Sequence, residues 1–196
     1  MPTTTFYNLN KDKREKVISA VRKEFTQKRL LDMSVKNIVE NANIARGSFY
    51  QYFVSKDDLI KFIIREDFLN EIKTITMLLD KSNGDLFEAA YEYLILGLNL
   101  TEDETKYTIN ITDYLKDYAI EEIKKINADI IKDYVDLKKL DIRSSEEFGA
   151  TLVILITLIS IARLSILNNI VTKEEGIRNY NMQIELLKRG LEKKEK

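Results

Sequence analysis

The sequence predicts an all-α fold with a small N-terminal head and a larger helical body. The only proline is Pro2 and there are six glycines, so little interrupts a helix along the 196 residues. Hydrophobic residues make up 44% of the chain, which is enough to bury a substantial core. Four capping-box patterns mark helix starts in the body, at residues 85–88, 101–104, 144–147 and 172–175.

The head should begin with a helix from about residue 10 to residue 28. Its apolar stripe consists of Val17, Ile18, Val21 and Phe25, and its other face carries Lys13, Arg14, Arg22 and Lys23. We expect the charged face to be solvated, with attraction of phosphates as the alternative. The start of the chain, MPTTTFYNLNK, lacks the apolar core of a signal peptide, so a cytoplasmic location is expected.

Residues 34–56 predict two short helices joined by a tight turn. Ser34 suits the N-cap of the first helix, and Asn43 tolerates the left-handed backbone that ends it. Apolar positions continue through Ile44, Phe49 and Phe53. The outward positions between them are Arg46, Gly47, Ser48, Tyr50, Gln51 and Tyr52. Such side chains suit phosphates and base edges of DNA, and an ordinary three-helix corner is the alternative.

Gly47 is the most informative residue of this stretch. Inside a helix, glycine costs about 1 kcal/mol relative to alanine. Its presence suggests that something must approach the backbone closely there, and duplex DNA in its major groove is one such partner.

The run I-A-R-G-S-F-Y-Q-Y-F-V-S-K-D-D-L, residues 44–59, resembles the DNA-binding signature of the TetR-type (tetracycline-repressor-like) transcriptional regulators. The matching residues are Ile44, Arg46, Gly47, Ser48, Phe49, Tyr50, Tyr52, Phe53, Lys56 and Leu59, with Phe25, Ser34, Val35 and Ile38 upstream. Two positions depart from the pattern. Ala45 stands where Ser or Thr is usual, and Asn43 stands where Gly is usual. The resemblance covers about the first third of the chain.

The resemblance implies an N-terminal three-helix helix-turn-helix DNA-binding domain and a C-terminal helical domain for ligand binding and dimerisation. We therefore expect a DNA-binding domain at residues 1–56, a linking helix at 57–80, and an effector-binding and dimerisation domain at 81–196. The expected DNA-binding residues are Ser34, Arg46, Gly47, Ser48, Tyr50, Gln51, Tyr52 and Lys56.

The body should consist of long helices. The helix that opens near Asp57 has no stop before residues 81–84, and the capping boxes then predict helices at about 86–99, 102–141, 145–170 and 173–194. The second of these is too long for one straight helix in a small domain. A break is therefore expected near residues 118–120, although neither Gly nor Pro marks it.

A cluster of tyrosines in the body predicts either an effector pocket or a half-exposed core. Buried tyrosine hydroxyls need partners, which a ligand could supply. The candidate pocket residues are Tyr91, Tyr107, Ile111, Tyr114, Tyr118 and Arg163. Arg163 is the only charge between Glu147 and Lys173, so its burial would require a compensating partner. We expect it to pair with a carboxylate such as Asp129 or Asp133, or to extend to the surface. The alternative is that it holds an anionic group of the effector.

Residues 148–171 are apolar over a length that could span a bilayer. Arg163 interrupts this stretch, a capping box opens it, and no cluster of Lys or Arg flanks it. We therefore expect another copy of the chain to cover it, giving a homodimer and no membrane protein. The expected interface residues are Ile156 and Ile159, together with a heptad-like stripe of Ile177, Tyr180, Ile184, Leu187 and Leu191.

Composition argues against an enzyme. The chain has no Cys and no His, which removes thiol nucleophiles, the commonest general base and the commonest ligands of transition metals. We expect no cofactor and no metal. Residues 1–65 hold 13 Lys and Arg against 7 Asp and Glu, whereas the remaining residues hold 18 against 25. A basic head on an acidic body is typical of a DNA-binding module with a regulatory domain.

The expected function is a homodimeric transcriptional repressor that binds palindromic double-stranded DNA and is released by a small-molecule effector. The alternative is a DNA-binding module controlled by a protein partner, without an effector.

Overall fold

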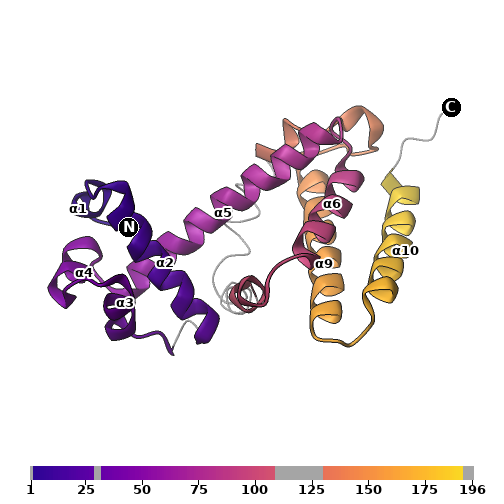
Figure 1. The fold of residues 1–196 in the computed structure, drawn as a ribbon. Helices are drawn as coiled ribbons and strands as arrows, with labels where there is room; N and C mark the ends of the chain where they lie inside the picture. Colours follow the sequence, from indigo (N-terminus) through magenta and orange to yellow (C-terminus); the bar gives the residue numbers. More distant parts are fainter. Residues whose placement is uncertain (1, 29–31, 109–129, 192–196) are drawn as a thin grey trace. The chain divides into compact units, whose positions relative to one another are not determined.

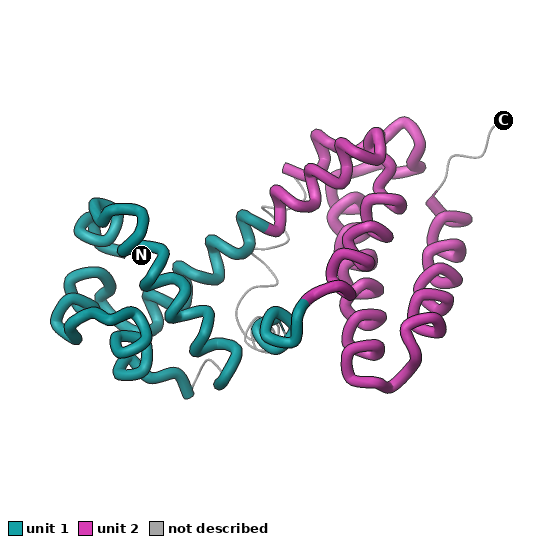
Figure 2. The backbone as a smooth tube through the Cα atoms, viewed as in Figure 1, with its two compact units in different colours: residues 1–70, 101–118 teal, residues 71–100, 119–196 magenta. Residues whose placement is uncertain are grey.

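The computed structural model describes residues 2–28, 32–108 and 130–191 of the chain (Figure 1). The backbone divides into two compact units, residues 1–70 with 101–118 and residues 71–100 with 119–196 (Figure 2). The predicted all-α class is confirmed, because the regular elements of the described residues are all helices. Residues 101–108 belong to the first unit. The expected domain bounds at residues 56 and 80 stay a prediction.

The first unit contains α1 (Thr4–Tyr7), α2 (Lys11–Gln27), α3 (Val35–Ala42), α4 (Arg46–Tyr52) and the beginning of α5 (Lys56–Lys81). Its core draws on all of these helices and is rich in aromatic residues. Fully buried members are Phe6, Val21, Phe25, Ile38, Phe49, Phe53, Leu59 and Ile63. The sequence did not predict α1, which places Phe6 in this core.

Side-chain caps fix the starts of α2 and α5 in the first unit. The Asn10 side chain accepts a hydrogen bond from the Lys13 amide at 2.9 Å, and the Ser55 hydroxyl accepts one from the Asp58 amide at 3.1 Å. Ser34 does occupy the N-cap of α3, as predicted, but its hydroxyl makes no capping hydrogen bond.

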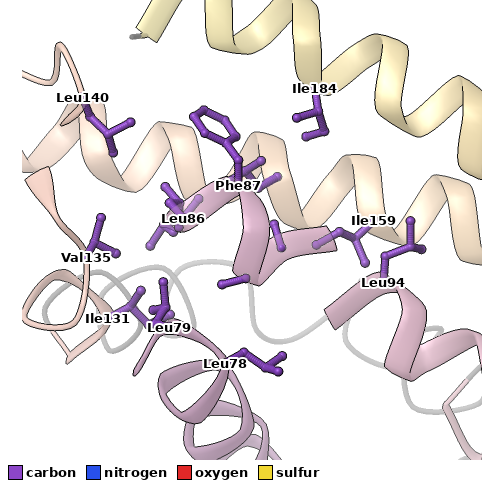
Figure 3. Packing of buried hydrophobic residues seen from close by; sticks show 14 of the residues in the cluster. Leu78, Leu79, Leu86, Phe87, Leu94, Ile131, Val135, Leu140, Ile159 and Ile184 are labelled. Atoms are coloured by element: carbon purple, nitrogen blue, oxygen red, sulfur yellow. The ribbon is translucent and has the colours of Figure 1, made fainter. Parts of the chain in front are cut away.

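The second unit contains the end of α5, α6 (Leu86–Leu98), the short 3-10 helix η2 (Leu137–Lys139), α9 (Ser145–Leu167) and α10 (Lys173–Leu191). Its core joins these elements, and Figure 3 shows Leu86 and Phe87 among Ile131, Ile159 and Ile184. The buried residues that line this core also include Leu79, Leu94, Val135, Leu140, Phe148 and Tyr180.

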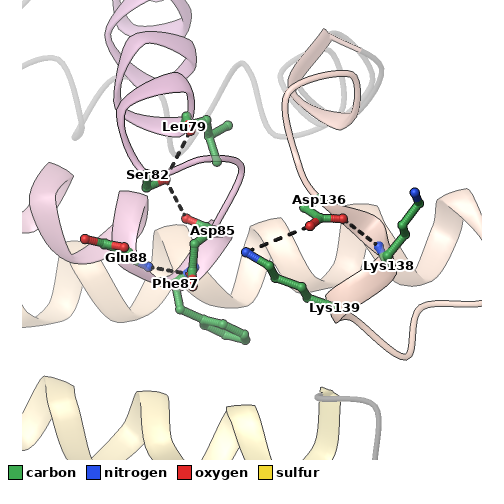
Figure 4. Close-up of polar contacts among 8 residues, drawn as sticks. All are labelled: Leu79, Ser82, Asp85, Phe87, Glu88, Asp136, Lys138 and Lys139. Carbon is green, nitrogen blue, oxygen red and sulfur yellow. Dashed lines mark hydrogen bonds and ion pairs between the residues drawn. The ribbon is translucent and has the colours of Figure 1, made fainter.

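The predicted capping residues begin the helices of the body. The Asp85 carboxylate accepts hydrogen bonds from the amides of Phe87 and Glu88, both at 3.0 Å (Figure 4). Thr101 and Glu104 form a complete capping box, in which the Thr101 amide donates to the Glu104 carboxylate at 2.8 Å and the Glu104 amide donates to the Thr101 hydroxyl at 3.3 Å. These starts are therefore confirmed.

The helix predicted to continue to residue 141 ends earlier. Residues 130–132 are helical, a turn follows, and η2 precedes an extended stretch. Asp136 stabilises this change. Its amide donates to the Gly84 carbonyl at 3.0 Å. Its carboxylate accepts from the Lys138 amide at 3.2 Å (Figure 4). Gly84 is required there, since it has a φ of 76° and a Cβ would lie 2.7 Å from the Asp136 nitrogen. The break expected near residues 118–120 lies outside the described residues.

Candidate nucleic-acid interface

The turn between α3 and α4 sets the direction of the candidate recognition helix α4. Asn43 adopts the predicted left-handed conformation, with φ 52° and ψ 51°. The Ile44 amide then donates back to the Val39 carbonyl at 3.0 Å, which closes the end of α3. Phe49 and Phe53 anchor the other side of α4, because both are fully buried.

The predicted DNA-binding residues fall into two groups. Exposed residues of α4 are Arg46, Gly47, Tyr50 and Gln51, and half-buried ones are Ser34, Ser48, Tyr52 and Lys56. The Lys56 ammonium donates to the Met33 carbonyl at 3.1 Å, which ties the start of α5 to the chain just before α3. The structure therefore brings all of these positions into one helix-turn-helix, with α4 presenting a polar surface.

Gly47 has no packing reason to be glycine. A Cβ built at this position meets nothing within 4 Å. The residue is exposed in the first turn of α4 and its φ is not positive. Neither side-chain packing nor backbone conformation therefore requires glycine at this position.

A buried carboxylate supports the start of α3, and the sequence did not single it out. Glu24 on α2 is 1% exposed and accepts hydrogen bonds from the Asn37 side chain at 2.9 Å and from the Ser34 amide at 3.4 Å. Lys28 lies 3.5 Å away and contributes the opposite charge. The available signal was the position of Glu24 on the apolar stripe of α2, where a charged residue needs buried partners.

Tyr107 attaches residues 102–108 to the rest of the first unit. Its hydroxyl donates to the Asp67 carboxylate, its ring meets the Phe25 ring edge-on at 5.5 Å, and the same carboxylate accepts from Arg22 at 2.6 Å. Burial, followed by the negative charge of Asp67, raises the pKa of Tyr107. Residues 102–108, which are helical, are thus joined to α2 and α5.

The other candidate effector residues are distributed differently. Tyr91 is half-buried against the core of the second unit, and Arg163 lies on α9. Ile111, Tyr114 and Tyr118 lie outside the described residues. The predicted pocket as a whole therefore stays a prediction.

Arg163 lies against α6, where Gly97 leaves room for it. A Cβ on Gly97 would be 2.5 Å from the guanidinium carbon. The neighbouring Tyr93 hydroxyl donates to the Glu71 carboxylate. Burial and then Glu71 raise the pKa of Tyr93, against the opposing charge of Arg163. Tyr93, Glu71 and Gly97 were not among the predicted site residues, since spacing along one helix does not show what a neighbouring helix brings.

The residues expected at the dimer interface differ in how far the chain itself already buries them. Ile159, Tyr180 and Ile184 are 5%, 1% and 6% exposed and are already covered within a single chain. Leu187 and Leu191 are half-buried against the same core, Ile177 is half-buried, and Ile156 is 41% exposed. The large exposed apolar residues on α9 and α10 are Ile154, Ile156, Ile161, Met182 and Leu186.

Helix α9 alone among the described residues is long and apolar enough to cross a membrane. Its mean hydropathy is 2.3 in the most apolar window, and 28% of that window is buried within the chain. Much of its apolar surface therefore faces outward, and one such helix is weak support for a membrane span.

The chain matches two family models and several known proteins. The model described as "Bacterial regulatory proteins, tetR family" matches residues 17–62, and "Tetracyclin repressor-like, C-terminal domain" matches residues 73–191. A curated relative, the "Uncharacterized HTH-type transcriptional regulator YuxN" of Bacillus subtilis (strain 168), is 29% identical over 158 residues, covering 76% of this chain and 53% of that protein. The chain thus spans about half the length of this relative.

Solved structures share the fold. A regulator from Chloroflexus aurantiacus J-10-FL is 22% identical with a TM-score of 0.53, and the match covers 99% of this chain and 100% of that one. The reduced form of E. coli NemR is 17% identical with a TM-score of 0.65, covering 88% of this chain and 96% of that one. At such identities the likeness concerns the fold alone.

Proposed function

The chain belongs to the TetR family of bacterial transcriptional regulators, and we propose that it is a cytoplasmic homodimeric repressor, released from a palindromic operator by a small-molecule effector. Each α4 would enter one major groove. Arg46, Gly47 and Ser48 would meet base edges or nearby phosphates. Ser34, Tyr50, Gln51, Tyr52 and Lys56 would hold the DNA backbone. No catalytic activity is proposed.

The observation that carries the DNA-binding proposal is the open space around Gly47. A glycine inside a helix lowers helix stability, and here no neighbouring side chain explains it. A partner outside the chain that needs the backbone surface of α4 does explain it. Base pairs in a major groove fit this requirement, because α4 has exposed polar residues on the same side.

Replacing Gly47 with alanine should separate folding from DNA binding. We expect the free energy of unfolding to stay the same or rise by up to about 1 kcal/mol, because alanine is the better helix former. Affinity for the operator should fall roughly tenfold or more, since a displaced base contact costs about 1–3 kcal/mol. Thermal unfolding and fluorescence anisotropy, with a duplex selected from a random library by the wild-type protein, measure both quantities.

Gly190→Ala is the matched control for this experiment. Gly190 is also exposed on a helix, α10, and a Cβ there meets nothing within 4 Å. This variant should gain similar helix stability and bind DNA normally. If Gly47→Ala binds the operator as tightly as the wild type does, the main support for α4 as the recognition helix is removed.

The outward faces of α9 and α10 support the homodimer. Ile154 and Ile161 are 44% and 52% exposed on α9, and Met182 and Leu186 are 58% and 66% exposed on α10. A groove along α10 is lined by Glu174, Ile177, Arg178, Asn181, Met182, Glu185, Leu186 and Arg189. Because both charge signs occur on this one surface, it is suited to meet its own copy across a two-fold axis. We propose these exposed positions as the interface, together with Ile156 and Ile177.

Arg163 supports an anionic effector. Its guanidinium is half-buried against Gly97 and forms no ion pair with a carboxylate among the described residues. An effector carboxylate or phosphate would supply that partner. Tyr91, Tyr107, Ile111, Tyr114 and Tyr118 complete the proposed set. Because Tyr107 contacts Asp67 and Phe25, a movement of residues 102–108 would act on α5 and α2.

A native mass spectrum of the protein purified from its own host tests this proposal. We expect a retained molecule with an acidic group, lost in the Arg163→Met variant while operator binding persists. Lys188→Met, which removes a cation on the neighbouring α10, is the control and should keep the molecule. A copurifying protein in place of a small molecule would favour control by a protein partner.

A further inference from the structure

We propose that residues 2–9 are a clamp that holds the C-terminal end of α4 in the orientation needed to read DNA. This inference rests on the proposed role of α4. Within the first unit, α1 and α4 lie in contact (Figure 1). Thr3 and Gln51, which are hydrogen-bonded there, are 48 positions apart in the chain. The clamp consists of Thr3, Phe6 and the residues between and beside them.

Hydrogen bonds from Thr3 close the end of α4. The Thr3 amide donates to the Tyr52 carbonyl at 2.9 Å, and the Thr3 hydroxyl donates to the Gln51 carbonyl at 2.6 Å. The last carbonyls of a helix have no partner within the helix. Since α4 has only seven residues, it is too short to be stable by itself and depends on such external partners.

The Phe6 ring adds a packed contact at the same place. Phe6 is fully buried, with its ring centre 4.8 Å from that of Phe53, 5.3 Å from that of Phe62 and 6.1 Å from that of Tyr52. It therefore lies between the end of α4 and the first turns of α5. Pro2 is buried as well, so the segment lies against the unit from its beginning.

The other end of the segment is fixed to α2. Asn10 caps that helix, and the Arg14 guanidinium donates to the Tyr7 carbonyl at 3.4 Å. The clamp thus connects the start of α2 with the end of α4. The α3–α4 turn already fixes the N-terminal end of α4, so the two attachments together set its direction.

If α4 becomes more mobile, the protein should lose sequence specificity to a greater extent than it loses general affinity for DNA. Base-edge contacts need a fixed helix, whereas phosphate contacts carry no sequence information and tolerate small displacements. The ratio of affinities for the selected duplex and for a scrambled one is therefore the property that the clamp controls. A residue with only a general role in stability would lower both affinities together.

Thr3→Val tests the clamp with the smallest change, because it keeps the shape and removes the hydroxyl donor. Amide hydrogen exchange in α4 should become about three- to tenfold faster, with exchange in α2 unchanged, as expected for the loss of one hydrogen bond. The affinity ratio for selected over scrambled duplex should fall by a similar factor. Phe6→Leu should act in the same direction and more strongly.

Thr5→Val is the matched control, since Thr5 is exposed on the same short helix. It should change neither exchange nor affinity. Unchanged exchange in α4 of both Thr3→Val and Phe6→Leu would overturn the clamp, and so would equal losses for both duplexes. If the wild type selects no duplex, the proposed function fails, while hydrogen exchange still decides whether residues 2–9 hold α4.

Discussion

Replacing Ile184 with glutamate should strongly destabilise the second unit of this protein. Ile184 is 6% exposed, and Figure 3 shows it directed from α10 into the core beside Phe87. The change removes a buried aliphatic side chain and places a carboxylate in an apolar core. We expect a loss of about 4 kcal/mol or more, against a total stability of about 5–15 kcal/mol for a typical protein. Urea unfolding followed by circular dichroism measures it.

Gln183→Glu is the matched control, because Gln183 is the exposed neighbour of Ile184 on the same helix. It adds the same charge and should leave the unfolding curve almost unchanged. A variant Ile184→Glu that keeps wild-type stability but sediments as a monomer would mean that Ile184 lies at a subunit surface and not in the core.

Introducing glutamate at both Ile154 and Ile161 should give a folded monomer that binds the operator only weakly. The two residues are two helical turns apart on one face of α9 and are 44% and 52% exposed. Two carboxylates on this face would be buried and would repel those of the partner in a dimer, but they remain solvated in a monomer. Operator affinity should fall about a hundredfold or more, because two linked half-site contacts become one.

Analytical ultracentrifugation and binding to the selected duplex check this expectation. Ile130→Glu is the control, since Ile130 is also apolar and 40% exposed but lies outside α9 and α10. It should remain dimeric. A double variant that still sediments as a dimer would exclude the outer face of α9 from the interface.

Signals that act within a few residues were read correctly from the sequence. Asn43 ends α3 in the left-handed conformation, and Asp85 and Thr101 cap the helices that follow them. Such predictions depend on side chains that bond to their own backbone, so the local sequence contains both partners. The all-α class follows in the same way from the lack of residues that break helices.

Predictions that needed knowledge of a distant partner were less reliable. The stripe that includes Tyr180 and Ile184 does lie on one face of α10, but periodicity cannot show whether α6 and α9 of the same chain or a second chain covers that face. The role of Thr3 is another example, because its hydrogen-bond acceptors lie almost fifty residues away. Gly97 likewise became informative only when α9 placed Arg163 against it.

The order of the two units along the chain affects how the protein is made. Synthesis from the N-terminus delivers α2, α3, α4 and the first half of α5 well before residues 101–108. Until then, Asp67 and the edge of Phe25 lack Tyr107, so the first unit is incomplete on a nascent chain. A fragment cut after residue 70, or a head transplanted onto another regulator, would leave the same surface open. A DNA-binding head that is transferred to another regulator therefore has to include residues 101–108.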